Sequence, residues 1–149
     1  MKISQDILKS LKLIVSEYPD AIVGGSISFI SRGLLHRDPH DIDIFLPDTQ
    51  KSFMGIFEMA DPESNIGSET TTDVDGHPIP RLSMTVEGVN VCIFKVPSYM
   101  LEYDLIEWMG IRFKSQTPKY GILAKKVYSE RNKKHMDDLN HIFSVLGER

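Results

Sequence analysis

Two acidic residues alternate with apolar residues in one short run, and this run constrains the fold more than any other feature. The run reads Asp41-Ile42-Asp43-Ile44-Phe45-Leu46. Alternate side chains of a β-strand share a face, so Asp41 and Asp43 would lie together while Ile42 and Ile44 point into the core. Neighbouring carboxylates raise one another's pKa unless a cation offsets their repulsion. Mg²⁺ binds carboxylate oxygens while keeping waters and substrate phosphates. The run therefore predicts a strand that presents a divalent-cation site.

Length, charge and cysteine usage predict a single soluble domain over residues 1–149. The net charge of −4 provides no overall basic field that would attract nucleic acid. Cys92 is the only cysteine, so we expect no disulfide and no disulfide-linked partner, as in a reducing compartment. The first residues lack the apolar centre of a signal peptide, and no stretch approaches the roughly 20 apolar residues of a membrane helix. We expect a cytoplasmic protein without a membrane partner.

Hydrophobic periodicity predicts a mixed α/β sheet with helices packed on it. The expected helices cover 7–18, 27–35, 53–60, 99–107, 117–128 and 136–146, with Ser4 capping the first and Thr117 capping the fifth, ahead of a proline at its first position. The expected strands cover 21–23, 41–46, 81–86, 89–96 and 111–113, with another near 66–71 in a polar, mobile excursion. Residues 117–146 would form a C-terminal helical portion.

A glycine-rich turn precedes the acidic run. Gly24-Gly25-Ser26 lies between an expected strand and an expected helix. Glycines let backbone N–H groups approach a ligand, and Ser26 can donate to a phosphate or cap the helix. A tight turn with a serine cap would explain the same residues. The order strand, turn, helix, acidic strand places the turn and both aspartates at one end of the sheet, where α/β sheets usually bind ligands.

These motifs resemble the DNA polymerase-beta type nucleotidyltransferase superfamily, including small bacterial and phage members linked to abortive infection and toxin–antitoxin systems. Gly24-Gly25-Ser26 followed by Asp41-x-Asp43 carries the resemblance, and Arg37-x-x-His40-Asp41-Ile42-Asp43 is similar to the arginine-plus-double-aspartate segment of those proteins. Weaker likenesses occur over 110–126 and 131–139. The resemblance extends from about residue 21 to residue 146.

The resemblance implies the nucleotidyltransferase fold and a metal-dependent transfer of a nucleoside monophosphate from an NTP to a hydroxyl. The acceptor would be RNA, a protein or a small molecule. Asp41 and Asp43 would be catalytic and would hold Mg²⁺ or Mn²⁺. The residues implied to bind the nucleotide or its phosphates are Gly24, Gly25, Ser26, Arg37 and Lys126.

The chain departs from the family at a third carboxylate, which should come from the strand over 89–94. Its position falls at Cys92, and Asn90 lies on the same face two residues earlier. Asn offers a weak oxygen ligand, while Cys suits softer metals or a small buried apolar role. Glu69 or Asp73 would be alternative acids. The alternative function is therefore a catalytically degenerate nucleotidyltransferase fold that binds a nucleotide, an RNA or a partner protein, and a third is an interaction domain with two surface aspartates.

The remaining candidate residues admit plain structural explanations. His36 and His40 flank the acidic run without a recognised zinc spacing, so we expect polar loop residues. His135 and His141 are expected on the surface of the last helix. Basic residues around the last two helices would form a solvated face, or would place Lys126 and Lys133 against a triphosphate or RNA. Trp108 and Phe113 are expected in the core.

Overall fold

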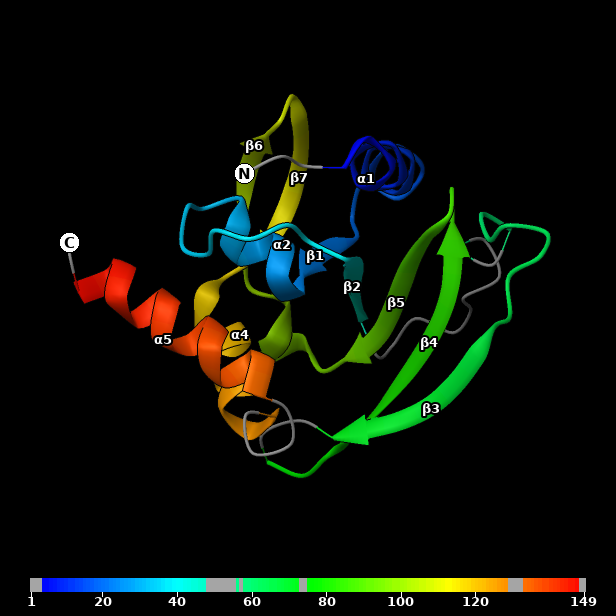
Figure 1. Cartoon of the computed structure of the whole chain (residues 1–149). Coiled ribbons are helices and arrows are strands. Elements are labelled where there is room, and N and C mark those ends of the chain that lie inside the picture. Colours follow the sequence, from blue (N-terminus) through cyan, green and yellow to red (C-terminus); the bar gives the residue numbers. More distant parts are fainter. Residues whose placement is uncertain (1–3, 48–55, 57, 73–74, 129–132, 148–149) are drawn as a thin grey trace.

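A single mixed sheet of seven strands organises the protein, as a computed structural model that describes residues 4–47, 56, 58–72, 75–128 and 133–147 shows (Figure 1). The strands lie in the order β3-β4-β5-β2-β1-β7-β6. Their bounds are β1 Ile22–Gly24, β2 Asp41–Pro47, β3 Gly67–Thr72, β4 Pro78–Val86, β5 Val89–Val96, β6 Tyr103–Trp108 and β7 Ile111–Gln116. The mixed sheet confirms the fold class expected from the periodicity.

The acidic run forms a central strand. β2 pairs antiparallel with β1 and parallel with β5, so Asp43 lies opposite Gly24 on one side and Cys92 on the other. Burial alternates along β2, with Ile42 and Ile44 buried and both aspartates partly exposed. The predicted strand and its two faces are therefore confirmed.

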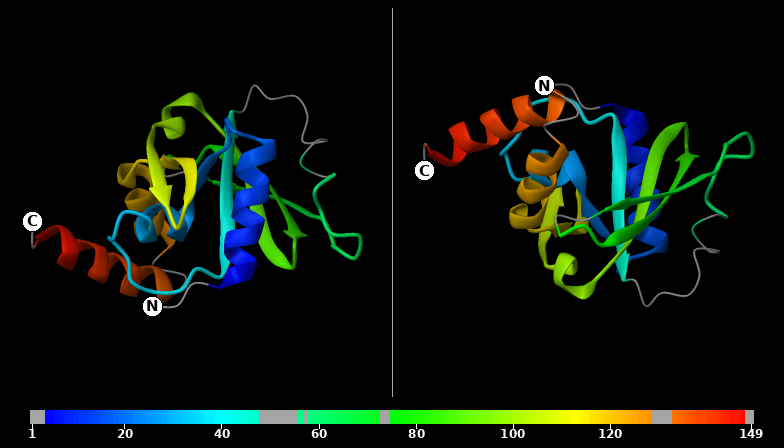
Figure 2. Two further views of the ribbon diagram at one scale, coloured as in Figure 1. Left: turned by 90° about the horizontal axis from the view of Figure 1, so that it is seen from above. Right: turned by 90° about the horizontal axis from the view of Figure 1, so that it is seen from below.

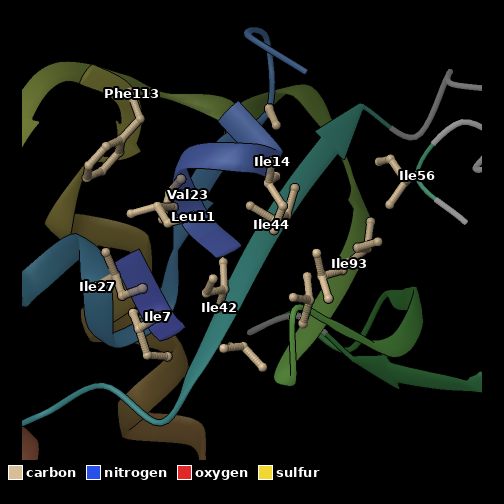
Figure 3. Packing of buried hydrophobic residues seen from close by; sticks show 14 of the residues in the cluster. Ile7, Leu11, Ile14, Val23, Ile27, Ile42, Ile44, Ile56, Ile93 and Phe113 are labelled. Atoms are coloured by element: carbon tan, nitrogen blue, oxygen red, sulfur yellow. The ribbon is translucent and has the colours of Figure 1, made fainter. Parts of the chain in front are cut away.

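Helix α1 covers the apolar face of the central strands. It spans Gln5–Glu17, and the Ser4 side chain caps it by accepting a hydrogen bond from the Asp6 N–H at 3.2 Å. Figure 3 shows Leu11 and Ile14 packed with side chains from the strands. Isoleucines and valines at alternate strand positions thus form the core, because they share the face that α1 covers. In this cluster α1 contributes Ile7, Leu11 and Ile14, and β1, β2 and β5 contribute Val23, Ile42, Ile44, Leu46, Val91 and Ile93.

The other helices lie away from α1. α2 spans Gly25–Ile30, α4 spans Pro118–Tyr128 and α5 spans Lys133–Gly147. Figure 2 shows α4 and α5 side by side, across β2 from α1. α4 and α5 are the last two elements of the chain that the structure describes. In the part of the chain that the structure describes, no helix is long and apolar enough to cross a membrane.

The strands predicted over 81–86, over 89–96 and near 66–71 are confirmed. β4 and β5 pair antiparallel around Glu87 and Gly88, whose φ angles of 52° and 77° suit a tight two-residue turn. The strand expected near 66–71 is β3, paired antiparallel with β4. Trp108 is partly buried and Phe113 buried against the core, as expected.

The helix predicted over 99–107 was wrong. The segment forms a short 3-10 turn, η1 over Ser98–Leu101, and then strand β6. β6 pairs antiparallel with β7 around Met109 and Gly110, whose φ angles are 52° and 78°. The alternation of Leu105 and Glu107 with Ile106 and Trp108 fits a strand. The same apolar residues also fit a helical spacing, and pairing with β7 favours the strand.

Four smaller expectations either need correction or lie outside the described residues. α2 is shorter than predicted and ends at Ile30, so Leu34 and Leu35 are buried from the following loop. The Thr117 hydroxyl has no hydrogen-bond partner, so it does not cap α4. Most of the helix expected over 53–60 lies outside the described residues, and so does Asp73.

Candidate functional site

A cavity of about 720 Å³ lies over the acidic face of β2. Asp41 and Asp43 both line it, together with Gly25 and Ser26. The opposite wall comes from α4 and from the first turn of α5. Those helices contribute Tyr120, Gly121, Ala124, Lys125, Lys134 and His135. The predicted meeting of the glycine–serine turn with both aspartates is therefore present in the fold.

The Asp43 carboxyl lies in an environment that opposes its ionisation. Burial raises its pKa, and the neighbouring Asp41 carboxylate raises it further, to about 7. Arg81, Lys125 and Lys134 act in the opposite direction without cancelling the effect. Ionising both aspartates thus costs free energy that a bound cation would offset.

The two glycines are explained by close approach of the turn to β2. Gly25 has φ +58°, and a Cβ built on it would lie 2.1 Å from Asp43 Oδ2. A Cβ on Gly24 would lie 1.9 Å from the Phe45 ring. Gly25 and Ser26 line the cavity, whereas Gly24 is not among its lining residues. The Asp43 carboxylate therefore occupies the space that a side chain at Gly25 would need.

Ser26 is held by a partly buried ionic network. Arg37 Nη2 donates to Ser26 Oγ at 2.6 Å. Arg37 also donates from Nε and Nη2 to the two carboxylate oxygens of Asp138, both at 3.0 Å. Lys125 Nζ donates to Asp138 Oδ2 at 2.8 Å. This network joins α2, the loop before β2, α4 and α5 around one carboxylate.

Asp138 is ionised in this network. Burial alone would raise the pKa of its carboxyl, but hydrogen bonds from Arg37 and Lys125 lower it to about 2. Arg37 and Lys125 carry two positive charges against the single negative charge of Asp138, so the network has a net positive charge. Lys125 brings this charge to the wall of the cavity. Arg37, expected to bind phosphate, instead positions Ser26 and is not among the lining residues.

The cationic residue of α4 at the cavity is Lys125 rather than the expected Lys126. Lys125 has a side chain 8% exposed and lies on the face of α4 that carries Gly121 and Ala124. Lys126 is exposed, with its Nζ 5.6 Å from the centre of the Phe143 ring. The helical spacing of Gly121 and Lys125, four residues apart, was the signal that could have found it.

Cys92, where the resemblance implied a third carboxylate, lies beside Asp43 in the sheet. Cys92 pairs with Asp43 and Asn90 pairs with Asp41 in the register between β2 and β5. Cys92 is buried, and Arg81 Nη2 donates to its Sγ at 3.1 Å. Arg81 also forms an ion pair with Glu69, and both line the cavity. An arginine and a thiol thus stand where the resemblance implied an acid.

Among the described residues, no group of three or more His, Cys, Asp or Glu side chains is arranged to hold a metal ion. The candidate metal site has two protein carboxylates. Mg²⁺ is commonly bound by one or two carboxylates, with waters and substrate phosphates completing its octahedron. The donor set and the cavity beside the two carboxylates therefore fit a magnesium ion that arrives with a phosphate ligand.

No protein-family model matches this sequence, and no curated protein sequence matches it either.

Sequence reasoning missed several residues of this cavity. His135 was expected on the surface, but it is half-buried and lines the cavity, where burial and then Lys125 and Lys134 lower its pKa. His141, by contrast, lies away from the lining residues, with Nε2 2.9 Å from His36 Nδ1. The cavity also has an aromatic part, formed by Phe45, Phe94, Tyr99 and Tyr120.

Proposed function

We propose that this protein is a metal-dependent nucleotidyltransferase that moves a nucleoside monophosphate from an NTP to a hydroxyl. The observation that carries the proposal is the pairing of Asp41 and Asp43 in a cavity whose opposite wall carries Lys125 and Lys134. The proposal includes a nucleotidyltransferase fold, which the strand–turn–helix–acidic strand order supports. The acceptor would be RNA, a protein or a small molecule.

The charges of the cavity suit a magnesium–triphosphate complex. Two carboxylates on β2 favour the cation, and the lysines of α4 and α5 favour the phosphate oxygens. A simple anion would be repelled by Asp41 and Asp43, while a bare cation would be repelled by Lys125 and Lys134. A ligand that carries both a positive and a negative charge would be attracted to the aspartates on β2 and to the lysines on α4 and α5.

The reaction would form a bond between the acceptor oxygen and the α-phosphorus and break the bond from that phosphorus to the β-bridging oxygen. Pyrophosphate leaves, and the hydroxyl proton passes to solvent. A bound Mg²⁺ would supply charge neutralisation at the phosphoryl group. Lys125 and Lys134 would stabilise the charge on the pyrophosphate, and Ser26, fixed by Arg37, would donate to a phosphate oxygen.

A second candidate function is nucleotide binding without transfer. Cys92 beside Asp43 favours it, because the buried thiol is hydrogen-bonded by Arg81 and supplies no carboxylate for a second metal ion. In that case the same cavity would bind a magnesium–nucleotide complex as a signal or as a scaffold for a partner.

An α-phosphate-labelled transfer assay tests the proposal. The purified protein is incubated with each labelled NTP, Mg²⁺ or Mn²⁺, and cellular RNA or protein, and NTP binding is measured in parallel by calorimetry. We expect label transfer that Asp43→Asn abolishes. The matched control is Asp6→Asn, which changes an exposed aspartate in the first turn of α1, outside the cavity.

The two candidate functions give different results. Binding that Asp43→Asn removes, without any label transfer, would support the second candidate and reject the first. If Mg²⁺ and NTP do not bind at all, or if they bind equally well to Asp43→Asn, neither candidate stands.

A further inference from the structure

Arg81 brings a positive charge to the sheet side of the cavity. It lies on β4, where its register partner on β5 is Phe94. Its side chain also reaches the neighbouring same-face position of β5, because Nη2 donates to Cys92 Sγ at 3.1 Å. Cys92 is in turn the register partner of Asp43. The guanidinium therefore lies one hydrogen bond away from the side chain that stands where a third carboxylate was implied.

The charge of Arg81 acts on the acidic pair of β2. Among the cations that lower the pKa of Asp43, Arg81 has the largest effect, ahead of Lys125 and Lys134. An arginine stays protonated at any pH at which the protein is folded, and its planar guanidinium matches the oxygens of a phosphate group. Arg81 therefore supplies a permanent positive charge and phosphate donors beside Asp43.

The protein partners of Arg81 hold its guanidinium without neutralising it fully. Nη1 donates to Glu69, which is 59% exposed on the edge strand β3, so solvent screens this ion pair. Nη2 donates to Cys92, and burial raises the pKa of that thiol, which therefore carries no charge at pH 7. Towards the described residues, each Nη thus uses one of its two N–H groups, and the second is left for a ligand in the cavity that Arg81 lines.

The acids that line the cavity are too few for two metal ions. Two-metal sites hold their cations about 3.5–4 Å apart and stabilise the attacking and the leaving oxygens together. The described lining residues include three acids, Asp41, Asp43 and Glu69, and Glu69 is already paired with Arg81. A second divalent cation beside Asp43 would also meet the positive charge of the guanidinium, which repels it in a partly buried site. The cavity therefore favours one metal ion and one fixed organic cation.

We propose that Arg81 takes the place of a second metal ion, so that the site binds one Mg²⁺ through Asp41 and Asp43 while Arg81 donates to the α-phosphate. This inference rests on the proposed function and adds a catalytic residue and a metal count to it. The bonds made and broken stay the same: the acceptor oxygen bonds to the α-phosphorus, pyrophosphate leaves, and the hydroxyl proton passes to solvent. Arg81 stabilises the negative charge on the non-bridging oxygens of the transferred group. Cys92 is then compatible with catalysis, because no third carboxylate is needed.

Counting bound metal ions tests the inference without any reaction. Equilibrium dialysis with Mn²⁺ and the α,β-methylene analogue of each NTP, which cannot be transferred, gives the number of Mn²⁺ ions bound per nucleotide. We expect one in the wild-type protein, and also one in Cys92→Asp, because the new carboxylate would pair with Arg81. The double variant Arg81→Gln/Cys92→Asp should bind two, since a third carboxylate then replaces the guanidinium. Two ions per nucleotide in the wild-type protein would overturn the inference.

Transfer rates test the contact of Arg81 with the transferred group. Arg81→Gln should lower kcat for label transfer about 100-fold, as the loss of one donor to a developing charge does, while the protein still binds one Mn²⁺ per nucleotide. Arg81→Lys keeps the charge and should recover about tenfold of the loss. The control is Arg112→Gln, the same change at an exposed arginine of β7 outside the cavity, which should leave kcat unchanged.

The outcomes separate this inference from the proposed function. If the wild-type protein transfers label with two bound ions, or if Arg81→Gln transfers as fast as wild type, the role of Arg81 is rejected while the proposed function stands. An Arg81→Lys variant as slow as Arg81→Gln would likewise reject the charge as its contribution. If neither Mn²⁺ nor nucleotide binds, the proposed function and this inference both fail. The wild-type count needs no variant, so the inference is decided even if Cys92→Asp does not fold.

Discussion

At the scale of single residues, Gly25 and Asp43 depend on each other. Gly25 has a left-handed backbone, and the space beside its Cα is occupied by the Asp43 carboxylate. From the sequence alone, a turn of this kind predicts a general phosphate-binding loop. Its observed role is more specific, because it keeps one carboxylate against the backbone of the turn at the edge of the cavity.

Gly25→Ala is expected to remove magnesium–NTP binding. The new Cβ would lie 2.1 Å from Asp43 Oδ2, so the carboxylate has to move. The left-handed backbone adds a cost of about 1–2 kcal/mol. The measurements are calorimetric titration with Mg²⁺ and NTP, and thermal unfolding.

Gly33→Ala is the matched control for this substitution. Gly33 also has a positive φ, +73°, but a Cβ there meets nothing within 4 Å. It should lose a similar amount of stability from backbone strain and keep its affinity for the ligand. Equal affinities in the two variants would contradict the role assigned to Gly25.

The residues of the site differ in how far the sequence could reveal them. Asp41, Asp43 and Cys92 were placed correctly, because alternation along a strand fixes which face each side chain takes. Lys125 and His135 were missed, because which face of α4 and α5 meets the cavity depends on how those helices pack on the sheet. Lys125 and Lys126 are neighbours in the sequence and so point to different sides of α4. Lys125 lines the cavity, whereas Lys126 is exposed.

At the scale of elements, Asp138 joins the C-terminal helices to the rest of the fold. Its side chain is 5% exposed and accepts hydrogen bonds from Arg37, before β2, and from Lys125 on α4. Breaking a buried ion pair on one side leaves an uncompensated charge, which is more costly than never having had the pair. The network therefore fixes α4 and α5 where they close the cavity.

Asp138→Asn is expected to lower the free energy of unfolding at pH 7 by about 3 kcal/mol, because it leaves buried Lys125 and partly buried Arg37 without a carboxylate. The effect should depend on pH. The folded-state pKa of Asp138 is about 2, below the unfolded value of about 3.9, so its stabilisation is present above pH 4 and is lost as the pH falls towards 2. Denaturant unfolding of wild type and variant from pH 7 to pH 2 measures this difference.

The control for this prediction is Asp20→Asn. Asp20 pairs with Lys114 at 3.0 Å but is 99% exposed, so solvent screens the pair. Its loss should change stability little at any pH. A gap between wild type and Asp138→Asn that stays constant below pH 4 would contradict the charged role of Asp138.

Elements with a single strong period were predicted best. The alternating burial of β2 and the alternating residues of β4 and β5 are compatible only with strands. The apolar residues of the segment that becomes β6 are compatible with either a helix or a strand. Leu105 is 71% exposed, so burial does not explain why it lies in a strand. The pairing of β6 with β7 is a tertiary contact, which local sequence does not encode.

At the scale of the whole molecule, the two faces of β2 carry different kinds of side chain. The face under α1 carries the apolar core, and the opposite face of β2 carries both aspartates and Phe45. Since α4 and α5 form the far wall of the cavity, a ligand between them and the sheet would connect parts of the chain more than 70 residues apart. Such a ligand should stabilise the fold as a unit.

Magnesium and NTP together are expected to raise the melting temperature by about 5–10 °C. A ligand at 100 times its Kd stabilises the folded state by about 2.7 kcal/mol, and 1 kcal/mol corresponds to about 2–4 °C in a protein of this size. Scanning calorimetry measures the shift, and hydrogen exchange should show added protection in α4 as well as in β2. Mg²⁺ alone should give a smaller shift, since phosphates complete its coordination, and Asp43→Asn should remove the response to the pair. A full shift in Asp43→Asn would mean that the nucleotide binds elsewhere, because that variant removes one of the two carboxylates that line the cavity on β2 while the lysine wall is unchanged.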